Sequence, residues 1–550
     1  MRVCTAILLQ VRPAVWPVIA ALLLLPQMAH AKVAAAAAPG EEMIALPKEP
    51  TDTTDPVDGD SLPPDDQVDA PPKILDVTST GFLDSRTTFG SVAVNRLLPS
   101  NDLPRLANLT EGNIQLKFHW AKSAMALVDA SFLYQRGGKF LANDGAGNAV
   151  NPGDHDVPNL RPAAILSEMY ATYEFGDHFN VTLGKKRVSW GSGLALSPAD
   201  LLNPAKDPTD PTMQRAGSWL IRAEMPLDTF TFSLVVAGKV TRQSGGIPQS
   251  LVFYPDNVLT PNYDPSGTVL ADGSDNRPHF ALAARAYALL AETDINAFYY
   301  MTQMYNDAFE YKNRGGLSLS HVFFNAVELH MEGIVQQGSS KLYFDSKCVD
   351  GGLSTVVGCL SEGNLPADRS KLLDSDWRTK VLVGGRYMFG EAASLTLEYY
   401  YNGEGYSPAE FDSYVRGVDL RRQAVAQNLK IPTNLFGNFG FAPSDPGSPQ
   451  KFAFDPLRRH YALLSYQQAQ IADDWTVMAV GILGLGDFSG TVAPQVVWSV
   501  REWLSLSVGA FITLPGIASR GGITIGNEGF TEYNAQPSVF RAFASARLFF

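Results

Sequence analysis

The sequence has little of what a soluble enzyme or a metal-binding protein needs. Charged residues make up 18% of its 550 residues, against about 25% in soluble domains. The eight histidines are scattered without metal-ligand spacing, and no Gly-x-Ser-x-Gly sequence surrounds a plausible nucleophile. Phosphate-binding loops and basic stripes for nucleic acid are also lacking. We therefore expect no enzyme activity, no metal, no cofactor and no nucleic-acid partner.

Apolar runs long enough to cross a membrane as a helix are lacking too. Such a helix needs about 18 uninterrupted apolar residues, whereas the stretch 14–25 is short and contains Pro17. Arg2 lies before this stretch, and a small-x-small sequence, Ala-His-Ala, follows it at 29–31. This order is typical of a secretory signal peptide, which we place at residues 1–31.

Cysteine is nearly absent from the remainder of the chain. Cys4 lies within the predicted signal peptide, so the exported part contains Cys348 and Cys359. An isolated pair of cysteines in an oxidising compartment predicts one disulfide, which here would close a short loop.

The acidic residues are concentrated near the N-terminus. The net charge of the chain is −13, and residues 41–76 hold eleven acids and two lysines, a local balance of −9. This segment is rich in proline and aspartate and has too few apolar residues to form a core. We predict that residues 32–76 are a disordered periplasmic leader, either a solvated spacer or a partner-binding tail. The main domain then spans 77–550.

The segment 538–550 shows the alternation of a membrane strand. Apolar residues occupy every second position: Leu548, Ala546, Ala544, Ala542 and Phe540. The intervening positions carry Arg547, Ser545 and Arg541, with Phe549 and Phe543 as exceptions. A strand has period 2, so this one presents an apolar face and a mixed face. Repeated strands of this kind predict an all-β fold, a transmembrane antiparallel β-barrel in the outer membrane. We count about 18 strands, within a range of 16–20.

The predicted strands are joined alternately by short and long connections. Short ones include Asn325 and Glu502, and long ones include 137–163, 240–277 and 403–457. Outer-membrane barrels have short periplasmic turns and longer external loops, whereas a soluble sandwich has no reason to sort its loops by length. The strands are expected at 78–89, 110–120, 124–136, 164–175, 179–190, 215–225, 229–239, 278–290, 294–304, 314–323, 326–337, 378–389, 393–402, 458–467, 475–485, 491–501, 503–514 and 538–550.

The inward positions of these strands carry charges of both signs. A lumen with charged side chains passes polar solutes, and the near balance of signs predicts weak ion selectivity. Alternatively, the charges pair across the wall and brace it. The acidic candidates are Asp129, Glu168, Glu174, Glu224, Glu328, Glu332 and Glu398; the basic candidates are Lys117, Lys186, Arg222, Arg285, Lys380, Arg386, Arg501, Arg541 and Arg547.

The most distinctive motif covers about twenty residues near the end of the fifth predicted strand. It runs Gly184-Lys-Lys-Arg-Val-Ser-Trp-Gly191 and continues through a polar loop to Pro-Ala-Asp-Leu-Leu-Asn-Pro204. The pattern resembles a recurring element of large bacterial outer-membrane channel families, the alginate-export-like and porin-type barrels. The resemblance implies that the loop folds into the lumen and narrows it, with constriction candidates Lys186, Arg187, Trp190, Asp200 and Asn203.

The lumen has further candidate residues: Glu168, Arg222, Arg285 and Arg386. Their mixed charge departs from the arginine-rich lumen that the resemblance implies for alginate exporters. The alternative is a turn-capping loop that leaves Trp190 at the membrane interface.

The longest predicted loop, 403–457, contains a helix start. Ser407 is a potential N-cap, a proline follows at the first helical position, and Glu410 completes a capping box. The helix is either a lid or plug over the barrel or an external helix.

Three functions remain open from the sequence: a passive outer-membrane channel, a barrel for polysaccharide export, and a structural barrel that conducts nothing. The expected partners are outer-membrane lipid, the barrel assembly machinery, and a small solute or polysaccharide. Phe550 and Leu548 are the predicted assembly signal, because the chain ends on an aromatic residue within an alternating strand.

Overall fold

The computed structural model describes the part of the chain that was predicted to form the barrel. The predicted signal peptide and the predicted leader up to residue 74 lie outside the described residues. The described ranges are 75–92, 106–120, 123–136, 160–194, 196–202, 217–239, 243–244, 247–248, 279–303, 311–324, 326–339, 343–361, 367–368, 376–390, 392–426, 456–517, 523–525, 528–533 and 538–550.

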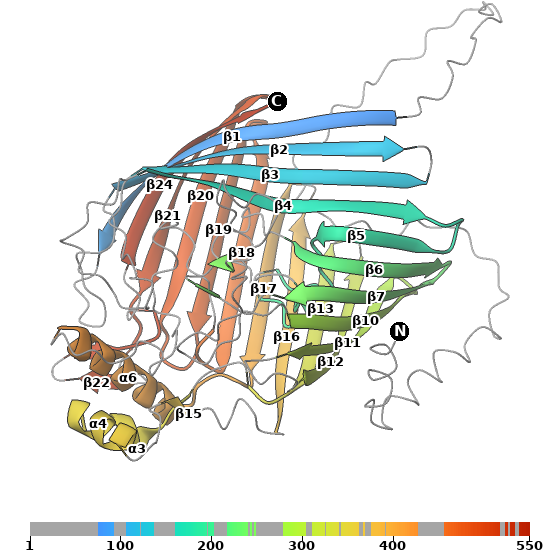
Figure 1. The fold of residues 1–550 in the computed structure, drawn as a ribbon. Helices are drawn as coiled ribbons and strands as arrows, with labels where there is room; N and C mark the ends of the chain where they lie inside the picture. The colour runs from blue at the N-terminus through green and yellow to red at the C-terminus, as the bar shows by residue number, and fades with distance from the viewer. Residues whose placement is uncertain are drawn as a thin grey trace, which may run out of the picture. The chain divides into compact units, whose positions relative to one another are not determined.

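Eighteen long strands form one antiparallel sheet that closes on itself (Figure 1). The ring is completed where β1 (Leu75–Val92) pairs with β24 (Ser538–Phe549). The predicted fold class and strand number are therefore confirmed. The other barrel strands are β2 (Leu106–Trp120), β3 (Ala124–Arg136), β4 (Leu160–Glu174), β5 (Asn180–Lys186), β6 (Ser218–Leu227), β7 (Phe230–Lys239), β10 (His279–Leu290), β11 (Thr293–Gln303), β12 (Tyr311–Phe323), β13 (Val327–Gln337), β16 (Trp377–Phe389), β17 (Ala393–Asn402), β18 (His460–Ile471), β19 (Trp475–Gly484), β20 (Gly490–Arg501) and β21 (Leu504–Leu514).

The outer face of the barrel is apolar, as the alternation predicts. On β24 the side chains of Leu548 and Ala544 are exposed, whereas Phe543 on the other face is buried. Bulky apolar side chains lie open on the same outer face elsewhere, including Leu183 at 61% and Leu397 at 58% exposure. A closed barrel pairs all its backbone groups while facing lipid, and an outward apolar band is the form that outer-membrane barrels take. The barrel therefore lies in the outer membrane.

The connections at one end of the barrel are tight turns and those at the other end are longer. We call these the turn end and the loop end. At the turn end, Ala291 and Glu292 link β10 to β11 with φ of 48° and 59°, the left-handed conformation of a two-residue hairpin turn. Because short turns of outer-membrane barrels face the periplasm, the loop end is external. No helix in the described ranges is both long and apolar enough to cross a membrane.

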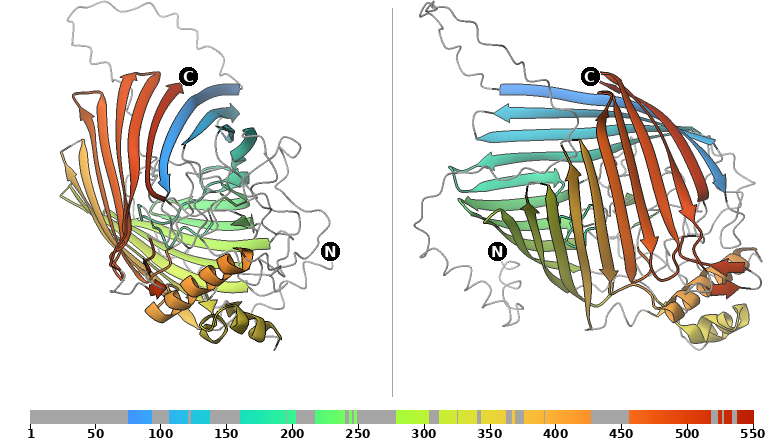
Figure 2. Two further views of the ribbon diagram at one scale, coloured as in Figure 1. Left: turned by 90° about the vertical axis from the view of Figure 1, so that its left-hand side faces the viewer. Right: turned by 180° about the vertical axis from the view of Figure 1, so that it is seen from behind.

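The loop end carries a small helical subdomain. α3 (Ser346–Val349), α4 (Leu353–Ser361) and α6 (Pro408–Ala426) lie together there (Figure 2). The short strands at this end form three pairs: β8 (Gln243–Ser244) with β9 (Ile247–Pro248), β14 (Tyr343–Phe344) with β15 (Ala367–Asp368), and β22 (Ile523–Ile525) with β23 (Glu528–Phe530). Side chains from the helices, β14 and β23 form what we call the external core: Tyr343, Phe344, Val349, Val356, Tyr406, Phe411, Tyr414, Val415, Leu420 and Phe530.

The start of α6 follows the predicted capping box. The Glu410 N–H donates to the Ser407 hydroxyl at 3.3 Å, and the Ser407 N–H donates to the Glu410 carboxylate at 2.8 Å. The helix contacts α3, α4, β14 and β22, so it packs within the helical subdomain at the loop end. In the same subdomain Cys348 and Cys359 are joined by a disulfide between α3 and α4.

The C-terminal residue completes the ring at the turn end of β1. The Phe550 N–H donates to the Gly81 carbonyl at 3.0 Å, and the Gly81 N–H donates to the Phe550 carbonyl at 2.8 Å. A Cβ at Gly81 would lie 2.7 Å from the Phe550 ring and 2.6 Å from the Asn113 carbonyl oxygen. Only glycine therefore lets the last residue approach the first strand this closely.

Deleting Leu548–Phe550 should prevent most of the protein from inserting. The deletion removes the last pairs of β24 with β1 and β21, which leaves unpaired backbone groups that lipid cannot satisfy. The amount of folded barrel in outer-membrane fractions measures the effect. A Phe550→Ser protein, which keeps the backbone pairing, separates the predicted assembly signal from ring closure. Normal insertion of the truncated chain would contradict both roles.

Candidate functional site

The segment after β5 is the candidate functional site. β5 has 7 residues, so the chain leaves the wall at Lys186 and continues as residues 187–194 and 196–202, which we call the inner loop. Gly184 just before it has φ of 133°, and a Cβ there would lie 2.2 Å from the Met169 carbonyl oxygen. This position therefore needs glycine. The backbone N–H and the guanidinium of Arg187 then both donate at 2.8 Å to the Glu168 carboxylate of β4, which directs the chain inward.

Glu332 of β13 holds the inner loop on the far side of the lumen. Its side chain is fully buried. Four groups of the inner loop donate to it: the Gly193 N–H at 2.5 Å, the Ser197 hydroxyl at 2.9 Å, the Ala199 N–H at 3.2 Å and the Ser192 hydroxyl at 3.3 Å. Hydrogen bonds to a charged acceptor are stronger than neutral ones, and a buried carboxylate needs such donors to offset its desolvation.

A second buried carboxylate extends this attachment. Glu398 of β17 accepts from the Leu194 N–H at 2.8 Å and lies 2.9 Å from Nε2 of His330. The Tyr300 hydroxyl of β11 donates to the Ala199 carbonyl at 2.6 Å. The inner loop is thus tied to β11, β13 and β17, three strands well separated from β5 in the ring.

Apolar contacts press the inner loop against the wall on both sides of these hydrogen bonds. Trp190 is 3% exposed, and its ring centre lies 5.3 Å from that of Tyr300. The alternative in which Trp190 lies at the membrane interface is therefore wrong. Further round the barrel, Leu196 of the inner loop belongs to a second cluster, which we call the inner core: Leu196, Leu382, Tyr400, Tyr461, Leu463, Ile482 and Tyr533.

The remaining constriction candidates lie along the inner loop or just before it. Lys186 lies over the Tyr170 ring of β4, with its Nζ 4.7 Å from the ring centre. Asp200 is half-buried within the inner loop. Asn203 lies outside the described residues. The structure therefore brings Lys186, Arg187, Trp190 and Asp200 together in one segment.

Of the additional lumen candidates, Glu168 binds Arg187 of the inner loop, whereas Arg222, Arg285 and Arg386 lie beside polar side chains of the barrel strands. Arg222 forms an ion pair with Glu224 on the same strand, β6. Nε of Arg285 donates to an asparagine side chain of β11 at 2.7 Å. Arg386 is exposed and lies opposite Glu328 in the register of β13 and β16.

Inward charges of both signs are partly buried and paired. Asp129, Glu332 and Glu398 are each 1% exposed or less, and each accepts hydrogen bonds. On β1 and β24 three arginines lie over aromatic rings: Arg541 over Phe511 at 4.9 Å, Arg86 over Phe543 at 4.9 Å, and Arg547 over Phe82 at 4.6 Å. Partly exposed side chains of both signs remain, such as Glu328 at 28% and Arg547 at 27%, so the accessible charge of the lumen is mixed.

Sequence reasoning named Glu332 and Glu398 only as two of several inward acids. It did not connect them with the inner loop, because their meeting depends on how far the strands lie round the ring. The one local signal is the composition of the inner loop, where Ser192, Gly193 and Ser197 supply hydroxyl and backbone N–H donors without bulky side chains. Such a segment can donate several hydrogen bonds to one carboxylate, but its sequence does not predict which acidic residue accepts them.

Replacing Glu332 with alanine should release the inner loop. Four donors would lose their shared acceptor, and hydrogen bonds to charged groups are worth about 1.5–3 kcal/mol each. A cysteine introduced at Leu194 reports on release through its labelling rate by a small maleimide. We expect labelling to accelerate at least about tenfold, the factor that about 1.4 kcal/mol produces.

Glu224→Ala is the matched control for this measurement. Glu224 is an inward carboxylate on β6 that accepts from the Ser233 hydroxyl at 2.9 Å and pairs with Arg222. Its loss should leave the labelling rate of the Leu194 reporter unchanged. Equal rates in the two variants would show that Glu332 does not hold the inner loop.

Comparison with known proteins gives fold likeness alone. No known family model matches the chain, and no curated protein sequence does. Among solved structures, OccK7 (OpdD) of Pseudomonas aeruginosa is similar at 9% identity and a TM-score of 0.40, covering 86% of this chain and 98% of that one. OccAB3 of Acinetobacter baumannii is similar at 9% identity and 0.42, covering 86% and 99%. A variant of Rh. blastica porin is similar at 12% identity and 0.33, covering 86% and 100%. We therefore argue the function from the inner loop and the lumen.

Proposed function

We propose that the protein is a porin-like outer-membrane channel through which small polar or moderately hydrophobic solutes pass passively. The observation that carries the proposal is the attachment of the inner loop to Glu332 and Glu398 inside an eighteen-stranded barrel. Eight-stranded barrels fill with side chains, whereas barrels of about 16–18 strands leave an aqueous lumen. A loop fixed across such a lumen sets the size of the solutes that pass.

The two sides of the lumen suggest where the passage lies. The inner loop packs against inward side chains of β6 to β19, and the stacked arginines lie on β1 and β24. We infer that solutes pass between these two sides, through the part of the lumen that the inner loop does not cover. Many hydrogen bonds hold the inner loop, so the constriction is part of the resting structure.

The row of arginines on β1 and β24 supports a modest preference for anions. Arg547 keeps 27% of its side chain exposed, and Arg86 and Arg541 lie along the same wall. Rings or rows of one sign of charge set the selectivity of a pore. The preference should be modest because Asp84 lies 3.1 Å from Arg547 and offsets part of its charge.

The same arginines favour one second candidate, export of an anionic polysaccharide by a barrel of the alginate-export-like kind. Arg541, Arg86 and Arg547 lie along one wall, where successive carboxylates of a polymer could meet them. The inner loop argues for small solutes first, since a polymer would have to pass beside it. Outer-membrane lipid and the barrel assembly machinery are the partners that we propose for either function.

Purified protein in a planar bilayer should conduct, and deleting residues 194–202 should raise the single-channel conductance. The deletion removes Leu194, Ser197 and Ala199, three of the residues through which Glu398 and Glu332 hold the inner loop, so the lumen widens. Glu502→Ala, in the exposed turn between β20 and β21, serves as the control and should conduct like the unaltered protein. If neither the intact nor the shortened protein conducts, the channel proposal fails and a structural barrel explains the fold better.

Lys186→Glu should shift the selectivity toward cations, with Lys186→Gln intermediate. The change places a negative charge at the start of the inner loop, where it acts on ions in the constriction. The reversal potential in a salt gradient measures the shift, which should shrink as salt rises because exposed charges are screened. An unchanged reversal potential in low salt would place Lys186 away from the ion path.

A further inference from the structure

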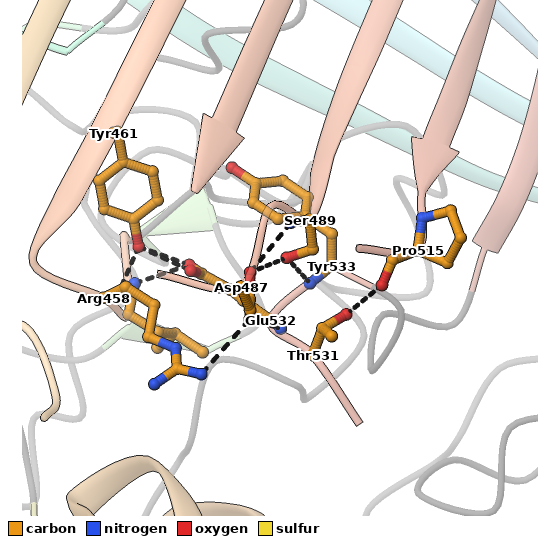
Figure 3. Close-up of polar contacts among 9 residues, drawn as sticks. Arg458, Tyr461, Asp487, Ser489, Pro515, Thr531, Glu532 and Tyr533 are labelled. Carbon is orange, nitrogen blue, oxygen red and sulfur yellow. Dashed lines mark hydrogen bonds and ion pairs between the residues drawn. The ribbon is translucent and has the colours of Figure 1, made fainter. Parts of the chain in front are cut away.

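Three connections at the loop end meet in a buried polar network (Figure 3). They are residues 456–459 before β18, residues 485–489 between β19 and β20, and residues 531–533 before β24. Each connection is hydrogen-bonded to the other two through side chains or backbone N–H groups. The network lies outside the strands that cross the membrane, at the end of the barrel that we assign to the exterior.

Asp487 lies at the centre of this network. One carboxylate oxygen accepts from the N–H and the hydroxyl of Ser489 at 3.0 and 2.7 Å. The other accepts from the Glu532 N–H at 2.9 Å and lies 3.4 Å from a guanidinium nitrogen of Arg458. Asp487 therefore has the donors and the positive charge that a buried carboxylate needs.

Glu532 is as deeply buried but has weaker support. The Tyr461 hydroxyl lies 2.7 and 2.8 Å from its two carboxyl oxygens, and the Leu457 N–H donates at 2.8 Å. A Cβ at Gly484, at the end of β19, would lie 3.6 Å from one of these oxygens. The carboxyl thus contacts the segment before β18, β18 itself and the end of β19, and its own backbone N–H is bound to Asp487.

The charges in the network do not balance when both carboxyls are ionised. Among the described residues, the cation within ion-pair distance of either carboxylate is Arg458, which is 3% exposed. The Tyr461 hydroxyl also contacts the Glu532 carboxyl, and Tyr533 acts electrostatically on Tyr461. Burial, reinforced by the charge of Asp487, raises the pKa of Glu532 to about 7.

Glu532 also lies between two apolar clusters. Phe530, two positions before it, belongs to the external core, against which Leu457 packs. Tyr533, directly after it, belongs to the inner core together with Leu196 of the inner loop. A displacement of residues 531–533 would therefore act on the helical subdomain and on the inner loop together.

We propose that Glu532 is a proton-operated clasp for the loop end of the barrel. With its proton, the carboxyl is neutral, and Asp487 and Arg458 remain as a balanced pair that holds the three connections together. When the proton leaves, a second negative charge stands in the same buried site and the connections separate. The inference goes beyond solute passage and does not depend on it.

The direction of the pH dependence follows from where the proton is bound more tightly. In the closed network the carboxyl keeps its proton up to about pH 7, whereas after opening it ionises near its ordinary value of 4.5. Between these values the closed form binds the additional proton, so the clasp is most stable at acidic pH. Its stability falls as pH rises through this window and levels off above it. The opening constant rises by at most about tenfold per pH unit.

Hydrogen–deuterium exchange of the protein in lipid vesicles tests the clasp. Protection of the amides in 456–459 and 531–533, corrected for intrinsic exchange, should fall between about pH 5 and about pH 8. Glu532→Gln cannot ionise and should keep the same protection throughout. Asp350→Asn, which removes an exposed carboxylate beside α3, is the matched control and should follow the unaltered protein.

Tyr461→Phe is a second variant with a different expected result. It removes a hydroxyl that stabilises the ionised carboxyl in the closed network, so the pH at which the loss of protection levels off should move to a higher value. Amide protection that is independent of pH in the unaltered protein would overturn the proposal. So would a Glu532→Gln protein whose protection falls with pH as in the unaltered protein. A Tyr461→Phe protein with the same pH dependence as the unaltered protein would also overturn it.

Conductance recorded on the same preparations keeps this proposal separate from the channel. If the protein conducts but its amide protection is independent of pH, the clasp proposal fails and the channel proposal stands. If the protein does not conduct but shows the expected exchange, the channel proposal fails and the clasp proposal stands.

Discussion

The constraint on which the whole structure depends is that every backbone group facing lipid must find a partner within the chain. A sheet meets that requirement only if it closes, since an open edge leaves N–H and carbonyl groups unpaired. Closure is made where β1 pairs with β24 and where Phe550 and Gly81 exchange hydrogen bonds. Once the ring of eighteen strands is closed, alternate side chains must point to lipid or to the lumen. The apolar band outside and the polar residues inside are two results of the same geometry.

The interior is organised by buried carboxylates rather than by a uniform lining of charge. Glu332 and Glu398 hold the inner loop, Glu168 receives its first residue, and Asp487 joins the external connections. Each is buried, so each must be matched by donors, and irregular loops supply these from backbone N–H groups that strands have already used. Charge that would otherwise face the solute is thereby removed from the lumen. The arginines of β1 and β24 rest on aromatic rings instead, and the charge that stays accessible is of both signs.

Local patterns in the sequence were enough to predict the elements of the fold. The alternation in 538–550, the sorted loop lengths and the capping box at Ser407 each report on neighbours in the chain, and the structure bears out the strand number, the topology and the helix start. The motif around Trp190 marked the segment that enters the lumen. The sequence did not predict which groups these residues contact. Glu332 was one of several equivalent inward acids, and Glu532 had no predicted role, because the groups that bind both residues are distant in the sequence.

The sequence by itself determined that the chain forms a closed barrel with one apolar face, since period-2 alternation and connection length are properties of consecutive residues. Only the tertiary structure decided which inward charges are buried, which carboxylates hold the inner loop, and that residues 456–459, 485–489 and 531–533 share one network. Those outcomes depend on strand register and on the curvature of the ring, which bring together groups far apart in the chain. The role of each buried carboxylate therefore depends on the hydrogen-bond donors that closure of the strand ring places around it.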